Sequence, residues 1–374
     1  MTTVTQIRHW SGRSSERNQS NRRGQNIKIS AAILQDVGTR IFDALGSPHE
    51  ESAWVAETLV RSNLRGYDSH GVFRIPQYVR NIQGGHVSPG ALFEIKKETR
   101  VMAVVDGHHG WGQVVARKAM ELAIEKAATH SIGAVAVRNS QHVSRLGEYP
   151  PMAVNRQMIG LAIINLYGGK EVEQVAPWGG IDPKLAPNPI SWAAPSGEDW
   201  PMVLDMTTSI IPEGKVRLAR HRGDQLPDGC IIDSEGNPTT DPADFYGPPP
   251  GALLPLGGLA GHKGYGLAIL TDLLGGALSG AGCVGQTKSP NGNGLYFQAI
   301  NIADFIPVHE FVRAVKELRL WIKSSRKSPG VEEILLPGEG GHRTMQRRLE
   351  DGIPVEENLW TEITEIAKKL NVRF

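Results

Sequence analysis

The sequence predicts an α/β protein whose N-terminal part is helical. Apolar side chains recur four apart over residues 33–45, which is typical of one helix face, whereas short β-rich runs begin at Val101. The 43 glycines and 24 prolines lie mostly at segment ends and indicate many tight turns. The chain of 374 residues is long enough for one large core or two smaller ones.

The N-terminal elements follow from helix start and stop signals. A first helix over 33–45 is ended by a glycine, after which Ser47 and Glu50 form the pattern of a capping box. We expect Ser47 to cap a second helix that runs to about Leu64. A third helix is predicted over 69–83, before a glycine pair.

The rest of the chain alternates between strand and helix patterns. A polar connection over 223–255, rich in Pro, Gly and Asp, is expected to lie on the surface, where it could cover a site. Strands are predicted at 101–105, 134–137, 160–164, 190–194, 203–204 and 296–302, and helices at 113–128, 263–278, 311–323 and 359–370.

Composition excludes several classes of function. Forty Lys and Arg against 39 Asp and Glu give a formal charge of +1, so we expect no nucleic acid partner. The longest apolar run, 264–284, contains Asp272 and several glycines, so we expect it to be buried in protein and expect no membrane partner. Cys230 and Cys283 are too few for a disulfide framework, which favours the cytoplasm.

Residues 1–28 differ from the rest of the chain. They carry six Arg or Lys residues against one acid, Glu16, and they contain no apolar stretch. We expect a disordered basic tail. An Arg-rich and Ser-rich start with few acids is also typical of transit peptides, so a targeting role is the alternative.

The common sequence signatures of enzymes do not occur. The chain contains no G-x-G-x-x-G after a strand, no P-loop, no H-E-x-x-H and no G-x-S-x-G. The Rossmann fingerprint is therefore absent from the chain, and we expect no metal site. Four compact polar or glycine-rich segments remain as candidates.

The first segment spans 65–74 and contains His70 and Arg74, which stand four apart at a predicted helix start. A histidine exchanges protons near neutral pH, and an arginine holds a carboxylate through two hydrogen bonds. Together they suit a 2-oxo or 2-hydroxy acid. The alternative is a surface pair on a capped helix.

The second segment, Asn139, Ser140, Gln141 and His142, follows a predicted strand. Ligands of α/β proteins commonly bind where strands end, so this cluster is a candidate to face a substrate or a nicotinamide. A hydrogen-bonded turn is the alternative.

Two further segments suggest a phosphate or ribose site. One joins 175–180 and 187–190 to a strand that ends in Asp205, Met206, Thr207, Thr208 and Ser209. The hydroxyl and backbone donors of this segment would bind a phosphate or a ribose. The alternative is that the Ser and Thr residues only cap a helix. The other is 261–266, where glycines and Lys263 stand at the start of an apolar helix. Small residues and a positive charge there would suit a pyrophosphate. The alternative is that the glycines only allow tight helix packing.

Taken in order, these motifs resemble the malate/L-lactate dehydrogenase type 2 family from about residue 29 to the end. The motifs are Asp68-Ser69-His70-Gly71 with Arg74, Asn139-Ser140-x-His142, Asn188-Pro189-Ile190, Asp205-Met206-x-Thr208-Ser209 and Lys263-Gly264-Tyr265-Gly266-Leu267. The resemblance implies a non-Rossmann NAD(P)-binding domain with a largely antiparallel mixed sheet, expected over 101–309. It also implies a homodimer and a helical domain built from both chain ends, expected over 29–100 with 310–374.

The resemblance also implies residue roles. His70 resembles the proton donor, Arg74 the carboxylate contact and His142 a second catalytic histidine, with Ser69, Asn139 and Ser140 beside the substrate. Many members read Gly-Thr-Asn-Pro where this chain has Ala186-Pro187-Asn188-Pro189, so Pro187 removes a hydroxyl and a backbone donor. The expected cofactor contacts are Asp205, Met206, Thr207, Thr208, Ser209, Ile210, Ile211, His262, Lys263, Gly338, Glu339 and Gly340.

The expected activity is hydride transfer between NAD(P) and C2 of a small 2-hydroxy or 2-oxo carboxylic acid. The alternatives are reduction of a cyclic imino acid, as in one branch of the family, and a binding protein without turnover. A cationic cluster would select NADP if it reached the 2′-phosphate on the adenosine ribose. Its members are Arg217, Arg220, His221 and Arg222. They would equally form a solvated helix face, and NAD is slightly favoured.

Overall fold

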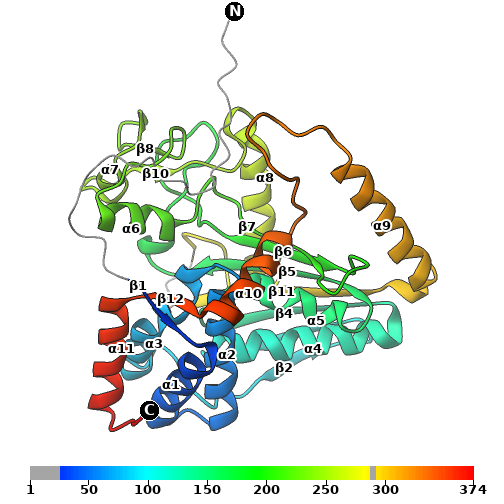
Figure 1. Ribbon diagram of the computed structural model, residues 1–374, viewed down its shortest axis with the longest axis horizontal. Coiled ribbons are helices and arrows are strands. Elements are labelled where there is room, and N and C mark those ends of the chain that lie inside the picture. Colours follow the sequence, from blue (N-terminus) through cyan, green and yellow to red (C-terminus); the bar gives the residue numbers. More distant parts are fainter. Residues whose placement is uncertain (1–25, 287–291) are drawn as a thin grey trace, which may run out of the picture.

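The centre of the molecule is a seven-stranded sheet (Figure 1). The computed structural model describes residues 26–286 and 292–374. In the sheet β3 and β4 run parallel, and the other neighbouring strands run antiparallel, which confirms the predicted α/β class and mixed sheet. In spatial order the strands are β2 (Glu94–Glu98), β3 (Met102–Asp106), β4 (Ile132–Ser140), β11 (Gly292–Asn301), β5 (Met158–Tyr167), β6 (Pro189–Ala194) and β7 (Met202–Thr207).

Helix α4 (Gly112–His130) joins the parallel strands β3 and β4 and packs against the sheet. A parallel pair needs such a crossover. The helix approaches β4 so closely that a Cβ at Gly133 would lie 2.0 Å from the carbonyl oxygen of Ala123. The short helix α5 (Pro150–Val154) packs against β5 and β6. The shared core includes Ala119, Met120, Val105, Val135, Leu295 and Phe297.

A second core joins both ends of the chain. Strand β1 (Asn26–Ile29) pairs antiparallel with β12 (Ile353–Glu356), and α10 (Glu339–Asp351) packs on α2. Its helices are α1 (Ala31–Ala44), α2 (His49–Leu64), α3 (Ile75–Gln83) and α11 (Glu357–Lys369). Ser47 does not cap α2 as predicted, because its hydroxyl accepts a hydrogen bond from the indole of buried Trp111 at 2.9 Å.

The polar connection predicted over 223–255 lies at the surface as expected, since most of its residues are exposed or half-buried, and it also has a small core of its own. Buried Val216, Ile231, Phe245 and Leu253 hold this part together, because the connection contains enough apolar residues to bury. The elements are α6 (Glu213–Arg222), β8 (Ile231–Ile232), β9 (Pro238–Thr239), α7 (Pro242–Tyr246) and β10 (Ala252–Leu253).

The predicted apolar run over 264–284 forms α8 (Gly261–Thr271), followed by a π-helical turn, Asp272–Ala277. Among the described residues, no helix combines the length and the apolarity needed to span a membrane.

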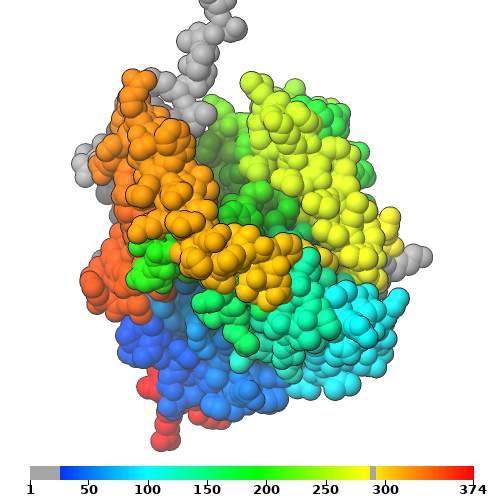
Figure 2. Space-filling model, turned by 90° about the vertical axis from the view of Figure 1, so that its right-hand side faces the viewer, coloured from blue at the N-terminus to red at the C-terminus, as the bar shows by residue number. Residues whose placement is uncertain are grey.

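Three segments differ from the expected division of the chain. Residues 1–25 of the predicted tail lie outside the described residues, but 26–28 belong to strand β1. Strand β2 belongs to the central sheet rather than to the helical part. Helix α9 (Val308–Lys323) has no buried residue, and Figure 2 shows it in orange, facing yellow-green α8 across a hollow.

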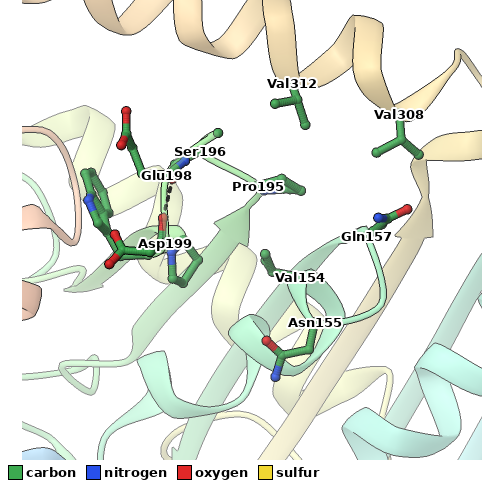
Figure 3. A pocket seen from close by; sticks show the side chains of 12 residues that line it. Val154, Asn155, Gln157, Pro195, Ser196, Glu198, Asp199, Val308 and Val312 are labelled. Atoms are coloured by element: carbon green, nitrogen blue, oxygen red, sulfur yellow. Dashed lines mark hydrogen bonds between the residues drawn. The ribbon is translucent and has the colours of Figure 1, made fainter.

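Helix α9 contacts the loop between β6 and β7. Val308 and Val312 face Pro195 and Val154 across a cavity of about 310 Å³ (Figure 3). Arg319 donates to the carbonyl oxygen of Ser196 at 2.9 Å. Helix α9 leaves large apolar side chains exposed, and they are Leu318, Leu320, Trp321 and Ile322.

Candidate active site

Two histidines from distant parts of the sequence stack on each other. His70 lies in a 3-10 turn, Asp68–His70, and His142 follows the end of β4. Their ring centroids are 5.8 Å apart, and the ring planes differ by 23°. The structure therefore brings together the first two predicted segments.

The tautomer of His142 follows from its hydrogen bonds. Gln113 Nε2 donates to the Tyr78 hydroxyl at 2.9 Å, so the hydroxyl hydrogen of Tyr78 is free to point at His142 Nδ1, 2.7 Å away. The backbone N–H of Ser144 also points at this Nδ1, at 3.4 Å. Because Nδ1 accepts, the proton of neutral His142 lies on Nε2.

Both imidazoles are neutral at neutral pH. Burial, followed by the charges of Arg74, Arg145 and Arg217, lowers the pKa of His70 to about 3. Burial, followed by the charges of Arg74 and His70, lowers the pKa of His142. The Ser69 hydroxyl lies 3.0 Å from His70 Nδ1 and orients that ring.

Arg74 is held in place but keeps donors for a ligand. Its Nε donates to the Ser69 carbonyl at 2.8 Å, and its Nη1 donates to Gln77 Oε1 at 2.7 Å. A guanidinium has five N–H donors, so the Nη2 side remains for a carboxylate. The predicted helix start at residue 69 is wrong, because two 3-10 turns carry His70 and Arg74, with Gly71 between them, and α3 begins only at Ile75.

Asn139 and Ser140 are bound into the turn that carries His142. Asn139 has φ 54°, donates to Asp106 Oδ1 at 2.9 Å and accepts from the Tyr167 hydroxyl at 3.4 Å. Ser140 is fully buried, and its hydroxyl donates to the carbonyl of Gln141. These contacts orient the turn and leave little of either side chain open.

Asp205 lies in β7 beside a buried group of charges. Its carboxylate accepts from the Gly147 N–H at 2.8 Å and lies 3.5 Å from Arg145 Nη1, while Arg145 pairs with Glu148 at 3.0 Å. Burial raises the pKa of Asp205, although Arg145 and the Gly147 N–H oppose that shift. Neighbouring Met206 is half-buried and pairs with Ile190 in the sheet.

The hydroxyls after Asp205 are used within the chain. Thr207 donates to the carbonyl of Pro187 at 3.0 Å, and Thr208 donates to the carbonyl of Asn188 at 2.9 Å. The Ser209 hydroxyl donates to the carbonyl of Ile211 at 2.7 Å. Pro187 thus still anchors this segment through its carbonyl, and the side chains of Ile210 and Ile211 pack on the small core of the α6 region.

The other two predicted cofactor segments approach the same strand and its extension. The N–H of Leu256, ahead of α8, donates to the carbonyl of Thr208 at 2.9 Å, and His262 and Lys263 are exposed at the start of α8. A Cβ at Gly338 would lie 2.9 Å from the backbone N of Val203 in β7. Gly340 follows in the first turn of α10, where buried Glu339 pairs with Lys323 at 2.8 Å.

The start of α8 suits a phosphate. No side chain caps its first turn, where the Gly261 N–H already donates to the Gly258 carbonyl and the exposed Lys263 adds a positive charge. Over residues 26–286 and 292–374, no group of three or more His, Cys, Asp or Glu residues is placed to hold a metal ion.

The sequence matches the malate/L-lactate dehydrogenase family over residues 29–364. It is 42% identical over 355 residues to a malate dehydrogenase of Pyrococcus abyssi, which covers 93% of this chain and 96% of that protein. It is 39% identical over 340 residues to an L-sulfolactate dehydrogenase of Methanocaldococcus jannaschii, which covers 89% and 94%. The chain belongs to this family.

Solved structures agree with this assignment. A malate dehydrogenase of Pyrococcus horikoshii matches with a TM-score of 0.83 and 39% identity, over 93% of this chain and 97% of that one. A Δ1-piperideine-2-carboxylate reductase of Pseudomonas syringae matches with a TM-score of 0.79 and 27% identity, over 91% and 100%. The prediction of an oxidoreductase that acts on a hydroxy acid is confirmed.

Sequence reasoning missed three residues that lie around this site. Tyr78 falls on the apolar face of the predicted third helix, where it looks like an ordinary core residue. Gln113 opens α4, and only its complete burial marks it as special. Arg145 lies in a segment where the sequence shows no motif, yet it is buried between Glu148 and Asp205.

Proposed function

We propose that the protein interconverts small 2-hydroxy and 2-oxo carboxylic acids with a nicotinamide dinucleotide. One observation carries this proposal: two neutral, stacked histidines lie beside an arginine whose Nη2 is open to a carboxylate. The bound nicotinamide would supply or accept the hydride.

Arg74 binds the substrate carboxylate, and His70 exchanges a proton with the oxygen on C2. In the free enzyme the low pKa of His70 keeps it in the base form that oxidation of an alcohol requires. A carboxylate bound to Arg74 cancels the nearest positive charge, so the pKa of His70 rises when a 2-oxo acid binds. That rise favours the proton donor needed for reduction.

His142 positions His70 by stacking. Because Tyr78 and Ser144 occupy its Nδ1, its Nε2–H faces away from them and keeps one orientation. Gln113 holds the Tyr78 hydroxyl, and both side chains are buried. This buried arrangement limits motion of the His70 ring during proton transfer.

The cofactor phosphates would bind at the uncapped first turn of α8 and Lys263. NAD is favoured over NADP, because the arginines of α6 do not gather at one point. Arg220 stacks over the Tyr246 ring at 4.6 Å, and Arg222 lies 3.6 Å from Glu356. A preference for NADPH that disappears in an Arg217→Gln/Arg220→Gln protein would reverse this choice.

The test of the activity is a His70→Ala protein assayed for reduction of 2-oxo acids by the absorbance of the reduced nicotinamide. We expect a loss of turnover of about 100- to 10,000-fold, with cofactor affinity preserved in calorimetry. Near-normal turnover on every acid that the parent reduces would remove His70 from this role.

A cyclic imino acid is the second candidate substrate, because the Pseudomonas syringae neighbour is named a reductase of such a compound. Arg74 would hold the carboxylate of either substrate. A panel of 2-oxo acids and cyclic imino acids, with NADH and NADPH, separates the two. Cofactor binding without any turnover on that panel would instead indicate a binding protein.

The protein is proposed to be a cytoplasmic homodimer. Both cysteines are free thiols, which fits a reducing compartment. Trp321 is 78% exposed and Leu320 62% exposed on α9, a helix without a buried residue. An apolar helix face of this kind is typical of an interface, and a second copy is its proposed occupant.

A further inference from the structure

Ser144 contacts both of the segments that carry the site histidines. It follows His142 by two residues, after the end of β4, and it is buried. Its hydroxyl donates to the carbonyl oxygen of His70 at 2.7 Å. Its backbone N–H points at His142 Nδ1, at 3.4 Å. One residue therefore holds the backbone of the first histidine and the ring of the second.

The partners of the Ser144 hydroxyl fix the direction of its hydrogen. A carbonyl oxygen only accepts hydrogen bonds, so the single hydrogen on Ser144 Oγ is committed to His70. The Ser62 hydroxyl of α2 lies 3.2 Å from this Oγ, and it donates to the carbonyl of Thr58 at 2.8 Å. Ser62 therefore packs against the Ser144 hydroxyl without competing for its hydrogen.

The backbone of Ser144 adopts a conformation that residues with a Cβ rarely take. Its φ is 64°, in the left-handed region where glycine is the favoured residue. Strain of this kind persists where the surrounding contacts impose it, and it is often found at functional sites. A glycine would form the same turn without the strain, but it would offer no hydroxyl to His70. The serine therefore adds a contact that the turn itself does not need.

We propose that Ser144 is a positioning residue that holds His70 in place against His142 during proton transfer. This inference rests on the proposed function, in which His70 exchanges the proton. The Ser144 hydroxyl fixes the backbone of the 3-10 turn, and the His142 ring lies on the other side of the stack. Because a small misplacement of a reacting group lowers the rate steeply, loss of the hydroxyl should slow the reaction. Substrate binding should change little, since Gln77 on α3 also holds Arg74.

The experiment compares Ser144→Gly with Ser144→Ala, because both remove the hydroxyl and only glycine removes the backbone strain. The probe is oxaloacetate or pyruvate, whichever the parent protein reduces faster with NADH. We expect both variants to lower the single-turnover rate at saturating acid by about 10-fold, while the acid concentration for half of that rate changes by less than about 3-fold.

Thermal denaturation separates positioning from a structural role. Ser144→Gly should melt at a higher temperature than Ser144→Ala, because alanine keeps a Cβ at a positive φ. A positioning role predicts the same loss of rate in both variants despite this difference. A merely structural role predicts that the rate follows the melting temperature, with Ser144→Gly the more active protein.

Ser131 provides the matched control. It is a serine with a positive φ of 69°, but it lies at the other end of β4, after α4. Ser131→Gly and Ser131→Ala should both keep the parent rate. This outcome would show that a change of backbone strain beside β4 does not by itself alter turnover.

Three results would overturn the inference while the proposed function stands. These are a parent-like rate in Ser144→Gly when His70→Ala is inactive, a loss of rate that follows the melting temperature, and a loss confined to binding of the acid or the nicotinamide. Parent-like turnover in His70→Ala would instead overturn the proposed role of His70, and this inference with it.

Discussion

Arg74 gives the sharpest test of the site at the scale of one residue. If it holds the carboxylate through the Nη2 side, Arg74→Lys should lower kcat/KM for the acid by about 100-fold, because a small misplacement of C2 is costly. Cofactor affinity should stay nearly unchanged. Steady-state kinetics with calorimetry measure both, and a silent substitution would contradict the carboxylate role.

The pKa of His70 makes a second prediction at this scale. Oxidation of a 2-hydroxy acid needs neutral His70, and its pKa in the free enzyme is lowered from 6.5 to about 3. The acid limb of kcat/KM for oxidation, which reports the free enzyme, should therefore fall well below pH 6.5. A limb centred near 6.5 in the pH–rate profile would show that His70 is not the base in this environment.

The sequence locates His70, Arg74 and His142 because each lies in a compact polar segment. It does not locate Tyr78 or Gln113. A tyrosine on an apolar helix face and a glutamine at a helix start have ordinary local patterns, and only the packing of α3 against α4 brings their polar atoms to His142.

At the scale of a structural element, we make a prediction about the turn around Gly71. A Cβ at this position would lie 2.0 Å from Oδ1 of Asn63, and this oxygen accepts from the Val72 N–H at 2.8 Å. Gly71→Ala should lower the free energy of unfolding by about 1–3 kcal/mol, since a displaced Asn63 leaves that buried N–H unpaired.

Chemical denaturation and kinetics measure the effect of Gly71→Ala. The same change should lower kcat, because the 3-10 turns that carry His70 and Arg74 shift. Gly341→Ala in α10, where a Cβ meets atoms at 3.6 Å or more, is the control and should be close to neutral. Full stability and full activity of Gly71→Ala would contradict the role of Asn63 in shaping the turn.

Elements with strong periodicity are predictable from sequence, whereas competing contacts decide their ends. The first helix is predicted over 33–45 and forms over Ala31–Ala44. The capping box at Ser47 fails because Trp111, far along the chain, takes its hydroxyl. A local rule cannot anticipate a partner supplied by tertiary packing.

At the scale of the whole molecule, we make a prediction about the oligomeric state from helix α9. We expect the parent protein to be a dimer by light scattering at micromolar concentration. Trp321→Glu should shift it toward monomer, because a charge would be buried where an apolar ring packs. Leu92→Glu changes a residue that is 66% exposed outside α9 and should leave the dimer intact. A monomeric parent would contradict the proposed interface.

The sequence by itself determined the α/β class, most helices of both chain ends and the order of the motif segments, because periodicity and turn chemistry are local. The family resemblance supplied the antiparallel sheet. Only the tertiary structure decided that His70 stacks on His142 and that Arg217 lies beside Phe73. The physical reason is that these contacts depend on where β4 and α6 pack, which no run of neighbouring residues encodes.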